Sequence, residues 1–451
     1  MTVTIVGAQL GDEGKGALVD RWGGPADVVV RFQGGDNAGH TVVSDGREYK
    51  LSLVPSGAVR DKTGVLGNGC VVNPRTLFSE VDDLRERGLD PDVRVARRAH
   101  VIMPYHRVLD GAEEGAKSDD DLEAGTTGRG IGPTYEDKAG RRGVRVGDLL
   151  DPDVLRERLE YVVPRTRRLA EEVYGMDLAT AETPELPVSL ADAFDLEWLH
   201  EQFAAYGRRL REESMTVDCG SYLAERHADG DRILFEGAQG TSLDIDHGGY
   251  PYVTSSNPTA GGAAVGTGVG PGVVGGGEVV GIVKAYLSKV GTGPMPTELD
   301  GPLADEVRER GGEFGTVTGR PRRIGWLDLP MLRHAARASG FTGVAVNHLD
   351  VLAGLDDLRV AEAYEVDGER VEVPPATAER WAACEPVYRA FEPWPEFDGR
   401  VAAEEGLEAL PAPARDYLDY LSAAVDAPVY AVGVGPDRAE TVEVTNPWEG
   451  A

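Results

Sequence analysis

The stretch that most constrains this chain runs from Val3 to Gly16 and reads VTIVGAQLGDEGKG. Its first four residues are β-branched and largely apolar, too few for a helix, and they end at Gly7, which predicts a buried strand leading into a glycine-rich loop. A helical pattern begins at Ala17. Strand, loop and helix N-terminus together form an anion site, because glycines let backbone N–H groups approach a phosphate and the helix dipole favours its charge.

The loop departs from the phosphate-binding motif GxxxxGK[ST] at two positions. Gln9 stands where the motif has its first glycine, and Gly16 stands where it has the serine or threonine that binds magnesium. A phosphate loop without that hydroxyl needs another metal ligand, and Asp12 is the candidate. The same residues are also compatible with an ordinary strand-to-helix turn, so this stretch alone leaves both interpretations open.

The composition excludes some classes of function. With 77 acidic and 46 basic residues, the 451-residue chain has a formal net charge of −31. Phosphate contacts need a basic face, so nonspecific nucleic-acid binding is not expected. Three cysteines without motif spacing fit a reducing compartment. No apolar run is long enough to span a bilayer, and the first strand begins too early for a signal peptide. We therefore expect a cytoplasmic protein with no membrane partner, adapted to high salt.

Further apolar runs alternate with helical patterns and end in polar, glycine-rich motifs. The runs at 27–32, 232–235, 343–346 and 429–432 lead into QGGDNAGHT, EGAQGTSLDIDHGGYPYVTSSN, NHLD and GVGPDR. This order predicts an α/β fold with a large, mostly parallel central sheet, flanking helices, and sites at the carboxyl ends of the strands. A helix is predicted from Pro74 to Arg87, and a small helical subdomain at about 151–215 lies within a single domain spanning 1–451.

The segment NHLD, from Asn347 to Asp350, is similar to the guanine-reading NKxD motif of GTPases. A carboxylate at Asp350 can accept both N1–H and the N2 amine of guanine in a bidentate, charge-assisted pair. The alternative is an aspartate that caps the turn after its strand.

Other residues have anion-binding chemistry. Arg320, Arg322 and Arg323 form a cationic cluster suited to carboxylates and phosphates, although a solvated basic turn has the same composition. The polar stretch 125–148 begins GTTGRG and is either a phosphate loop or a flexible connector. His40 lies in a glycine-lined loop that leaves it open to ligand, whereas a lone histidine is otherwise often structural.

Taken in order, these motifs resemble the adenylosuccinate synthetase family over essentially the whole chain. The matching segments are GDEGKG, NAGHT, GTTGRGIGPTYEDKAGRRG, FEGAQGTSLDIDHGGYPYVTSSN, TGRPRRIGWLD and GPDR. The resemblance implies a fold related to P-loop NTPases and a homodimer. It also implies GTP-dependent ligation of IMP and L-aspartate to adenylosuccinate, with release of GDP and phosphate through 6-phosphoryl-IMP, the first committed step of AMP biosynthesis. One Mg²⁺ per subunit is expected.

The same resemblance implies roles for individual residues. Asp12 would be the general base on N1 of IMP and a Mg²⁺ ligand, the carbonyl of Gly39 a second Mg²⁺ ligand, and His40 the acid that stabilises the transferring phosphoryl group. Lys15 would lie between the GTP phosphates and IMP, and Arg141 would bind the IMP phosphate across the dimer interface. Further GTP contacts match Gly11, Glu13, Gly14, Gly16, Thr41, Arg322, His348, Leu349, Asp350, Gly433, Val434 and Gly435. IMP contacts match Asn37, Ala38, Thr127, Gln239, Thr254 and Arg320, and the aspartate loop matches Thr316, Val317, Thr318, Gly319, Arg320, Pro321 and Arg322.

Three positions depart from the family pattern. Asp36 stands where a histidine is common, Pro321 where a third arginine is common, and His348 where a lysine packs its stem on the base. A histidine ring can stack on the base instead.

Two other classes of protein share some of these features. A regulatory GTPase would use the first loop and NHLD but would not need GTTGRG or the arginine cluster. A nucleotide-binding protein without catalysis would not need Asp12, Lys15 and His40 together. Phosphate release that requires both IMP and aspartate separates the ligase from both alternatives.

Overall fold

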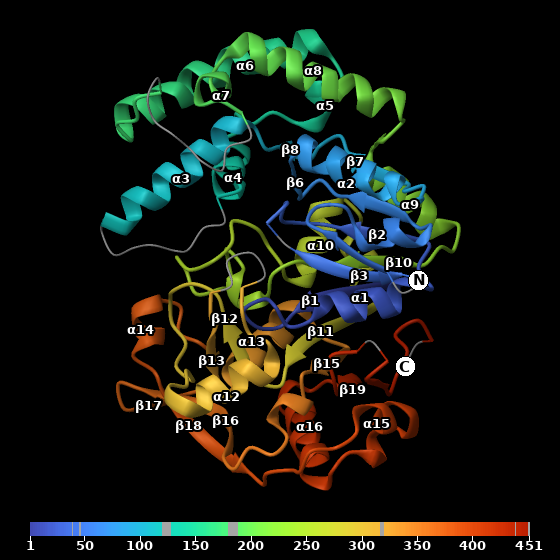
Figure 1. Ribbon diagram of the computed structural model, residues 1–451, viewed down its shortest axis with the longest axis vertical. Coiled ribbons are helices and arrows are strands. Elements are labelled where there is room, and N and C mark those ends of the chain that lie inside the picture. The colour runs from blue at the N-terminus through green and yellow to red at the C-terminus, as the bar shows by residue number, and fades with distance from the viewer. Residues whose placement is uncertain are drawn as a thin grey trace. The chain divides into compact units, whose positions relative to one another are not determined.

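The computed structural model describes residues 1–37, 39–44, 47–119, 128–178, 188–315, 320–437 and 439–449. The chain forms two compact units (Figure 1). Unit 1 comprises Met1–Pro25, Gly237–Gly261 and Pro271–Ala451, and unit 2 comprises Ala26–Glu236 and Gly262–Gly270. The helix α10 (Ala260–Thr267) begins in unit 1 and ends in unit 2.

Unit 1 is built around parallel strands in the order β19, β15, β11, β1, with β20 antiparallel beside β19. The strands are β1 (Thr2–Gly7), β11 (Glu278–Lys284), β15 (Gly343–Asn347), β19 (Val429–Gly433) and β20 (Thr441–Glu443). All residues of β1 and β15 are buried, as expected for short apolar runs in a parallel sheet. Because the four strands are parallel, the polar motifs that follow β1, β15 and β19 emerge at the same edge of the sheet.

A second sheet in unit 1 was not predicted from the sequence. It consists of β14 (Leu327–Asp328), β16 (Leu358–Val366), β17 (Glu369–Val371) and β18 (Glu385–Phe391), with β12 (Leu287–Lys289) and β13 (Arg323–Gly325) forming a separate antiparallel pair. The helices of this unit are α1 (Lys15–Gly23), α11 (Pro271–Gly275), α12 (Gly301–Gly311), α13 (Leu329–Ser339), α14 (Ala378–Ala382), α15 (Gly399–Glu405) and α16 (Ala412–Val425), with 3-10 turns η3 (Thr241–Leu243), η4 (Asp350–Leu352) and η5 (Leu407–Ala409).

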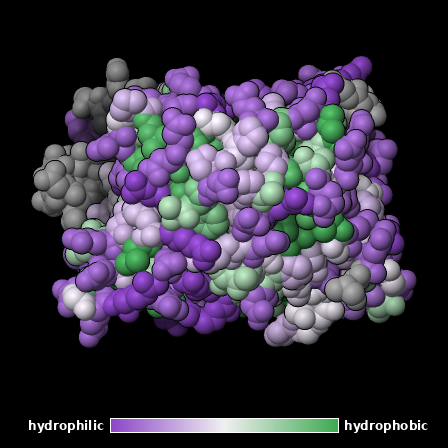
Figure 2. Space-filling view, turned by 90° about the horizontal axis from the view of Figure 1, so that it is seen from below, coloured by the Kyte–Doolittle hydropathy of each residue, from purple (hydrophilic) through white to green (hydrophobic). Residues whose placement is uncertain are grey.

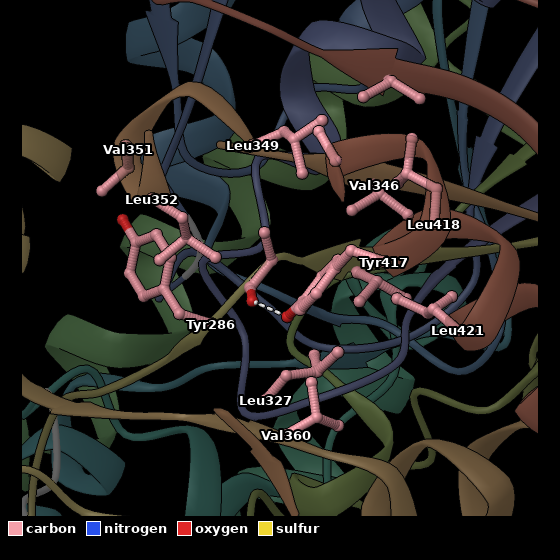
Figure 3. Close-up of a cluster of buried hydrophobic side chains, with 14 of the residues drawn as sticks. Tyr286, Leu327, Val346, Leu349, Val351, Leu352, Val360, Tyr417, Leu418 and Leu421 are labelled. Atoms are coloured by element: carbon pink, nitrogen blue, oxygen red, sulfur yellow. Dashed lines mark hydrogen bonds between the residues drawn. The ribbon is translucent and has the colours of Figure 1, made fainter. Parts of the chain in front are cut away.

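The hydrophobic core of unit 1 joins β15 and the turn after it to helix α16 (Figure 3). Leu349 is fully buried in this cluster together with Leu418 and Leu421 of α16. The hydroxyl of Tyr417 donates a hydrogen bond of 2.6 Å to the carbonyl of Ala285, just after β11. The core therefore fixes the carboxyl ends of β11 and β15, from which the polar loops begin.

Unit 2 contains parallel strands in the order β10, β2, β5, β7, β9. They are β10 (Ile233–Glu236), β2 (Val28–Arg31), β5 (Thr63–Leu66), β7 (Val93–Ala96) and β9 (Thr216–Val217). Two smaller pairs accompany them: antiparallel β3 (His40–Ser44) with β4 (Arg47–Leu51), and parallel β6 (Val71–Val72) with β8 (His100–Val101). Parallel strands with helices in both units confirm the predicted α/β fold.

Several helices of unit 2 begin after residues whose side chains cap them. The predicted helix at 74–87 is confirmed as α2 (Pro74–Glu86), capped by Asn73, whose side chain accepts from the N–H of Arg75. Within the segment expected to be helical, α6 (Pro152–Arg168) and α8 (Leu196–Glu212) begin after Asp151 and Asp195 and lie side by side (Figure 1). The remaining elements are η1 (Ser56–Arg60), α3 (Pro104–Asp119), α4 (Ile131–Ala139), α5 (Val146–Leu149), the π-helix η2 (Leu169–Val173), α7 (Leu190–Ala193) and α9 (Cys219–Ala228).

The one face drawn in the space-filling view is largely hydrophilic (Figure 2). Hydrophobic residues lie there in smaller groups between the hydrophilic ones. In the described parts of the chain, no helix combines the length and the apolar character required to cross a bilayer.

Candidate active site

The loop after β1 is held together by the buried carboxylate of Glu13. One oxygen of Glu13 accepts hydrogen bonds from the backbone N–H groups of Gln9 (3.0 Å) and Gly11 (2.9 Å), and the other lies 2.5 Å from Nζ of Lys15. Gly14 has φ +80°, and a Cβ there would come within 2.8 Å of Nδ2 of Asn347, so a larger residue does not fit. The loop thus presents a cation and a glycine-lined backbone, as predicted from the sequence.

Asp12 occupies the tip of this loop with φ +57°, which a non-glycine residue rarely adopts. Its side chain is about half exposed, and one carboxylate oxygen lies 2.8 Å from Nη2 of Arg322. The structure therefore brings together two residues predicted from different motifs, the candidate base and an arginine of the candidate aspartate loop.

The segment after β15 lies against the same loop. The side-chain amide of Asn347 donates to the carbonyl of Glu13 at 2.7 Å, and the N–H of Leu349 donates to the carbonyl of Gly433 at 3.1 Å. Oδ1 of Asp350 is buried and has no hydrogen-bond partner among the described residues. Burial raises the pKa of Asp350, and nearby Glu440 raises it further. A bound base that donates two N–H groups would satisfy this carboxylate.

His348, beside that carboxylate, is held in the left-handed region with φ +61°. Its ring packs edge to face with Tyr286, with 6.1 Å between the ring centroids. Burial lowers the pKa of His348 to about 4, so the ring is neutral at neutral pH. A neutral aromatic ring at this position suits a stacking role and not the charged role of a lysine.

Gln239 and Thr254 lie in the segment that follows β10, and backbone hydrogen bonds tie this segment to β1 and its loop. The N–H of Gly237 donates to the carbonyl of Ile5, and the N–H of Ser242 donates to the carbonyl of Gln9. Gln239 has φ +58°, and its buried Oε1 finds no partner in the described residues. Within unit 1, Gln239 is therefore brought close to the first loop, as predicted.

In unit 2, His40 begins β3 and faces the end of β10. Nε2 of His40 lies 3.6 Å from Oε1 of Glu236, too far for a hydrogen bond, and has no hydrogen-bond partner among the described residues. The other oxygen of Glu236 accepts from the N–H and hydroxyl of Ser56 at 3.2 and 2.9 Å. Burial lowers the pKa of His40, although the charge of Glu236 opposes this shift.

Asn37 and Asp36 precede His40 in the same glycine-rich segment. Oδ1 of Asn37 is buried and unpartnered in the described part of the chain. Asp36 is buried, and its Oδ2 accepts from Nδ2 of Asn73 at 3.0 Å and from the hydroxyl of Thr76 at 2.8 Å. Asp36 therefore fixes α2 against the segment that carries Asn37.

Arg141 follows helix α4 and lines a basic cavity of about 500 Å³ in unit 2. It is exposed and has φ +59°. The cavity is also lined by His100, Lys138, Arg142, Arg145, Arg158, Gly143, Asp148, Glu157 and Tyr161. Burial lowers the pKa of Lys138, as expected for a cation among other cations. In a chain with a net charge of −31, this local excess of positive charge points to an anionic ligand.

The other predicted site residues are placed as follows. Gly16 is the second residue of α1, and Val434 and Gly435 follow β19. The residues Gly39 and Thr41, beside His40, and Arg320 and Pro321, before β13, are exposed. Leu349 and Gly433 are buried. Ala38, Thr127, Thr316, Val317, Thr318 and Gly319 lie outside the described residues.

The predicted site residues did not include Asn347, Glu236 and Glu313, which contact them, or Lys284, which pairs with Glu313. Asn347 is the first residue of the NHLD segment, and Glu236 the first of EGAQG, so both were visible as polar residues at strand ends. Lys284 ends the apolar run VVGIVK and is buried. A lysine is rarely fully buried unless it is paired, so a lysine at the end of an apolar run indicates a buried ion pair. Glu313, which contacts Arg322, had no recognisable signal in the sequence.

The sequence and the fold are similar to those of known proteins. A family model described as adenylosuccinate synthetase matches residues 4–442. Adenylosuccinate synthetases from Natronomonas pharaonis and Halobacterium salinarum are 68% and 66% identical, the first over 99% of this chain, the second over all of it, and both over their whole length. The structure of fully ligated adenylosuccinate synthetase from Plasmodium falciparum is similar with a TM-score of 0.87 at 34% identity, covering 98% of this chain and 99% of that one.

Proposed function

The chain belongs to the adenylosuccinate synthetase family, and from this premise we propose how its own residues carry out the family's reaction. That reaction is the GTP-dependent ligation of IMP and L-aspartate to adenylosuccinate, with release of GDP and phosphate. One observation supports the assignment of residues most directly. Asp350, Gln239, Asn37 and His40 each carry a buried polar atom without a hydrogen-bond partner among the described residues. Buried polar groups are normally paired, so an unpaired polar atom on each of these four residues favours ligand binding.

Asp12 acts as the general base in this proposal. The C6 oxygen of IMP is a poor leaving group, and removal of the N1 proton turns it into a nucleophile for the γ-phosphoryl group of GTP. Asp12 is suited to this role because its carboxylate is about half exposed and lies 2.8 Å from the guanidinium of Arg322. General base catalysis of this kind contributes about 10²–10⁴-fold.

His40 and Lys15 act on the phosphoryl group. Phosphoryl transfer needs mainly positioning and neutralisation of charge, which an acid at His40 and an ammonium at Lys15 provide. Phosphate then leaves when the amine of aspartate attacks C6. The carboxylate of Glu236 favours the protonated ring, although burial outweighs it and lowers the pKa of His40 in the protein without substrates.

A Mg²⁺ ion fits this proposal, with the carboxylate of Asp12 and the carbonyl of Gly39 as protein ligands. Mg²⁺ usually keeps several waters and is bound by one or two carboxylates together with substrate phosphates, so a single exposed carboxylate on a phosphate loop suits it. Among the described residues there is no cluster of three or more metal-binding side chains, which also fits an ion that binds with the nucleotide. The ion would supply neutralisation of charge on the transferring phosphoryl group.

The substrates are assigned to separate groups of residues. We propose that Asp350, His348 and Leu349, with Gly433, Val434 and Gly435, bind the guanine base. Gln239, Asn37 and Thr254, with Ala38, Thr127 and Arg320, would bind IMP, and the residues from Thr316 to Arg322 would bind aspartate. The unpartnered Oδ1 of Asp350 and Oε1 of Gln239 support the first two assignments.

An isotope experiment tests the order of these steps. IMP labelled with heavy oxygen at C6 should deliver the label to inorganic phosphate during turnover, because the C6 oxygen leaves attached to phosphorus. Mass spectrometry of the phosphate reads the result. Asp12→Asn should abolish the transfer, and His40→Asn should suppress it nearly as far while leaving IMP binding largely intact. Unlabelled phosphate from the active enzyme would contradict the proposal, since direct attack by aspartate releases the oxygen to solvent.

We propose further that the enzyme is a cytoplasmic homodimer in which Arg141 serves the IMP phosphate bound to the other subunit. The exposure of Arg141 and the basic cavity around it support a role outside its own subunit. Inactive Arg141→Leu and inactive Asp12→Asn subunits, when mixed, should regain activity, because the hybrid dimer has one intact site. If subunits exchange and activity does not return, Arg141 acts within its own chain or not at all.

A further inference from the structure

A buried ion pair in unit 1 is not used by the proposed mechanism. Lys284 and Glu313 are 2% and 1% exposed, and Nζ of Lys284 lies 2.5 Å from Oε1 of Glu313. The same ammonium donates to the hydroxyl of Ser288 at 2.7 Å, and the hydroxyl of Tyr286 donates to Glu313 at 2.6 Å. Burying two opposite charges is often no more stabilising than an apolar pair of the same volume. The pair therefore calls for an explanation other than stability.

The second oxygen of Glu313 points to such an explanation. It accepts from Nη1 of Arg322 at 2.7 Å, while Nη2 of the same guanidinium lies 2.8 Å from Asp12. A backbone hydrogen bond joins the same two residues, since the N–H of Arg322 donates to the carbonyl of Glu313 at 3.0 Å. A guanidinium is a rigid planar fork, so fixing one of its nitrogens also fixes the direction of the other.

We propose that Glu313 is a positioning residue, whose carboxylate, fixed by Lys284 and Tyr286, orients Arg322 toward Asp12 and the reacting groups. Before substrates bind, Arg322 holds the carboxylate of Asp12. An anionic group of a substrate then takes the place of Asp12 on Nη2, while Nη1 stays on Glu313. This inference rests on the proposed function, because Asp12 and Arg322 must act on the substrates for their orientation to matter.

The charge of Glu313 is well suited to this role. Burial alone would raise the pKa of Glu313, but Lys284, Tyr286 and Arg322 outweigh it and lower the pKa to about 2. The carboxylate is therefore ionised at every pH at which the enzyme can work. A glutamine would place an N–H₂ group or a weaker acceptor against Lys284 and Arg322, and the orientation of the guanidinium would be lost.

The test is a double-mutant cycle between Glu313→Gln and Arg322→Ala, with kcat and KM measured for all three substrates. Glu313→Gln should lower kcat about 100-fold, because a small misplacement of the reacting groups has an effect of this size. The same variant should raise KM for aspartate and for GTP and leave KM for IMP unchanged. In the Arg322→Ala background the same substitution should have no further effect, because Glu313 acts only through Arg322. Equal effects of Glu313→Gln in both backgrounds would overturn the proposal.

Two further variants separate positioning from stability. The double variant Glu313→Gln with Lys284→Met removes both buried charges, so it should regain the melting temperature without regaining kcat. Recovery of kcat together with stability would show a merely structural pair and overturn the proposal. Asp328→Asn alters another fully buried carboxylate of unit 1 and should change stability with kcat and KM unchanged. The proposed function itself would be refuted if phosphate release by the wild-type enzyme did not require both IMP and aspartate.

Discussion

At the scale of single residues, four site residues share an uncommon backbone conformation. Asp12, Arg141, Gln239 and His348 have φ between 57° and 61°, a region that costs a non-glycine residue about 1–2 kcal/mol. Residues in such conformations persist only where the surrounding structure determines them strongly. Asp61, Ser214, Asp367 and Asp426 share this conformation, so it is not confined to the predicted site residues.

The proposed guanine-reading role of Asp350 gives a prediction on nucleotide preference. Asp350→Asn should weaken GTP binding by roughly 1.5–3 kcal/mol, because a charge-assisted hydrogen bond in a buried pocket is lost. The amide should favour XTP, whose C2 oxygen needs a donor. Steady-state KM values for GTP and XTP measure the change. An unchanged preference for GTP would remove Asp350 from the base pocket.

Asp328 gives a prediction on pH. Burial raises the pKa of Asp328 from its ordinary 3.8 to about 6, although the hydroxyl of Tyr364 lowers it. The folded state thus binds this proton more tightly than the unfolded state, and the stabilisation is full below the unfolded pKa and lost as the pH rises through about 6. The difference corresponds to about 3 kcal/mol.

Asparagine at position 328 does not titrate, so Asp328→Asn removes this dependence. Urea unfolding at about pH 4 and about pH 7 should show that the wild type loses stability relative to the variant as the pH rises. The ionic strength is kept equal in both series, since screening alone changes stability in an acidic chain. A stability difference between the two proteins that stays constant with pH would contradict the assignment.

At the scale of elements, the contact of α8 with α5 depends on a glycine. A Cβ at Gly207 of α8 would collide with the carbonyl of Leu149 in α5, whereas a Cβ at Gly111 of α3 would meet nothing within 4 Å. Gly207→Ala should therefore lower the melting temperature despite the better helix propensity of alanine. Gly111→Ala should raise stability by about 1 kcal/mol. Thermal unfolding of this matched pair checks the packing, and equal effects of the two substitutions would contradict it.

The elements that could be predicted were those with a local pattern. β1, β11, β15 and β19 are short apolar runs ended by glycine or polar residues, so both the strands and the loops after them followed from the sequence. The second sheet around β16 was missed, although β16 and β17 form a hairpin whose two-residue turn, Asp367-Gly368, is a local signal in the sequence. The pairing of β16 with β14 and β18 joins residues farther apart and has no such local signal.

The candidate site residues likewise divide into those with a local sequence pattern and those without one. The loop residues from Gly11 to Gly16 were predicted because glycines and a lysine share one segment. The pairing of Glu313 with Lys284 joins residues 29 positions apart, and neither is next to a recognisable motif. The left-handed conformation of Gln239 was equally unpredictable, since glutamine has no preference for it. Long-range electrostatic contacts and strained conformations are set by the fold and have no local signature.

At the scale of the whole molecule, the dominant feature is charge. The chain has 77 acidic and 46 basic residues, so like charges repel one another over its surface. Ion pairs on the surface, such as Arg156 with Glu197, offset little of this repulsion, because solvent and salt screen the attraction between exposed charges. The folded state is therefore expected to depend on screening by salt.

Melting temperatures measured across ionic strength test this expectation. The Debye length falls from about 10 Å at 0.1 M to about 3 Å at 1 M, so molar salt should raise the melting temperature. Sucrose at matched osmolality is the control, since it is excluded from protein surfaces without screening charge. Maximal stability in dilute buffer would refute the high-salt interpretation.

The pairing of Lys15 with Glu13 has a consequence for ligand choice in concentrated chloride. A free ammonium on a phosphate loop would be neutralised by whichever anion is most abundant. Here the counterion belongs to the loop itself, and because it is tethered, its local concentration does not fall as bulk salt changes. Chloride brings one charge and gains little by displacing a carboxylate, whereas a triphosphate brings several charges and many acceptor oxygens. We therefore expect the loop to select its anion by valence, in concentrated salt as in dilute buffer.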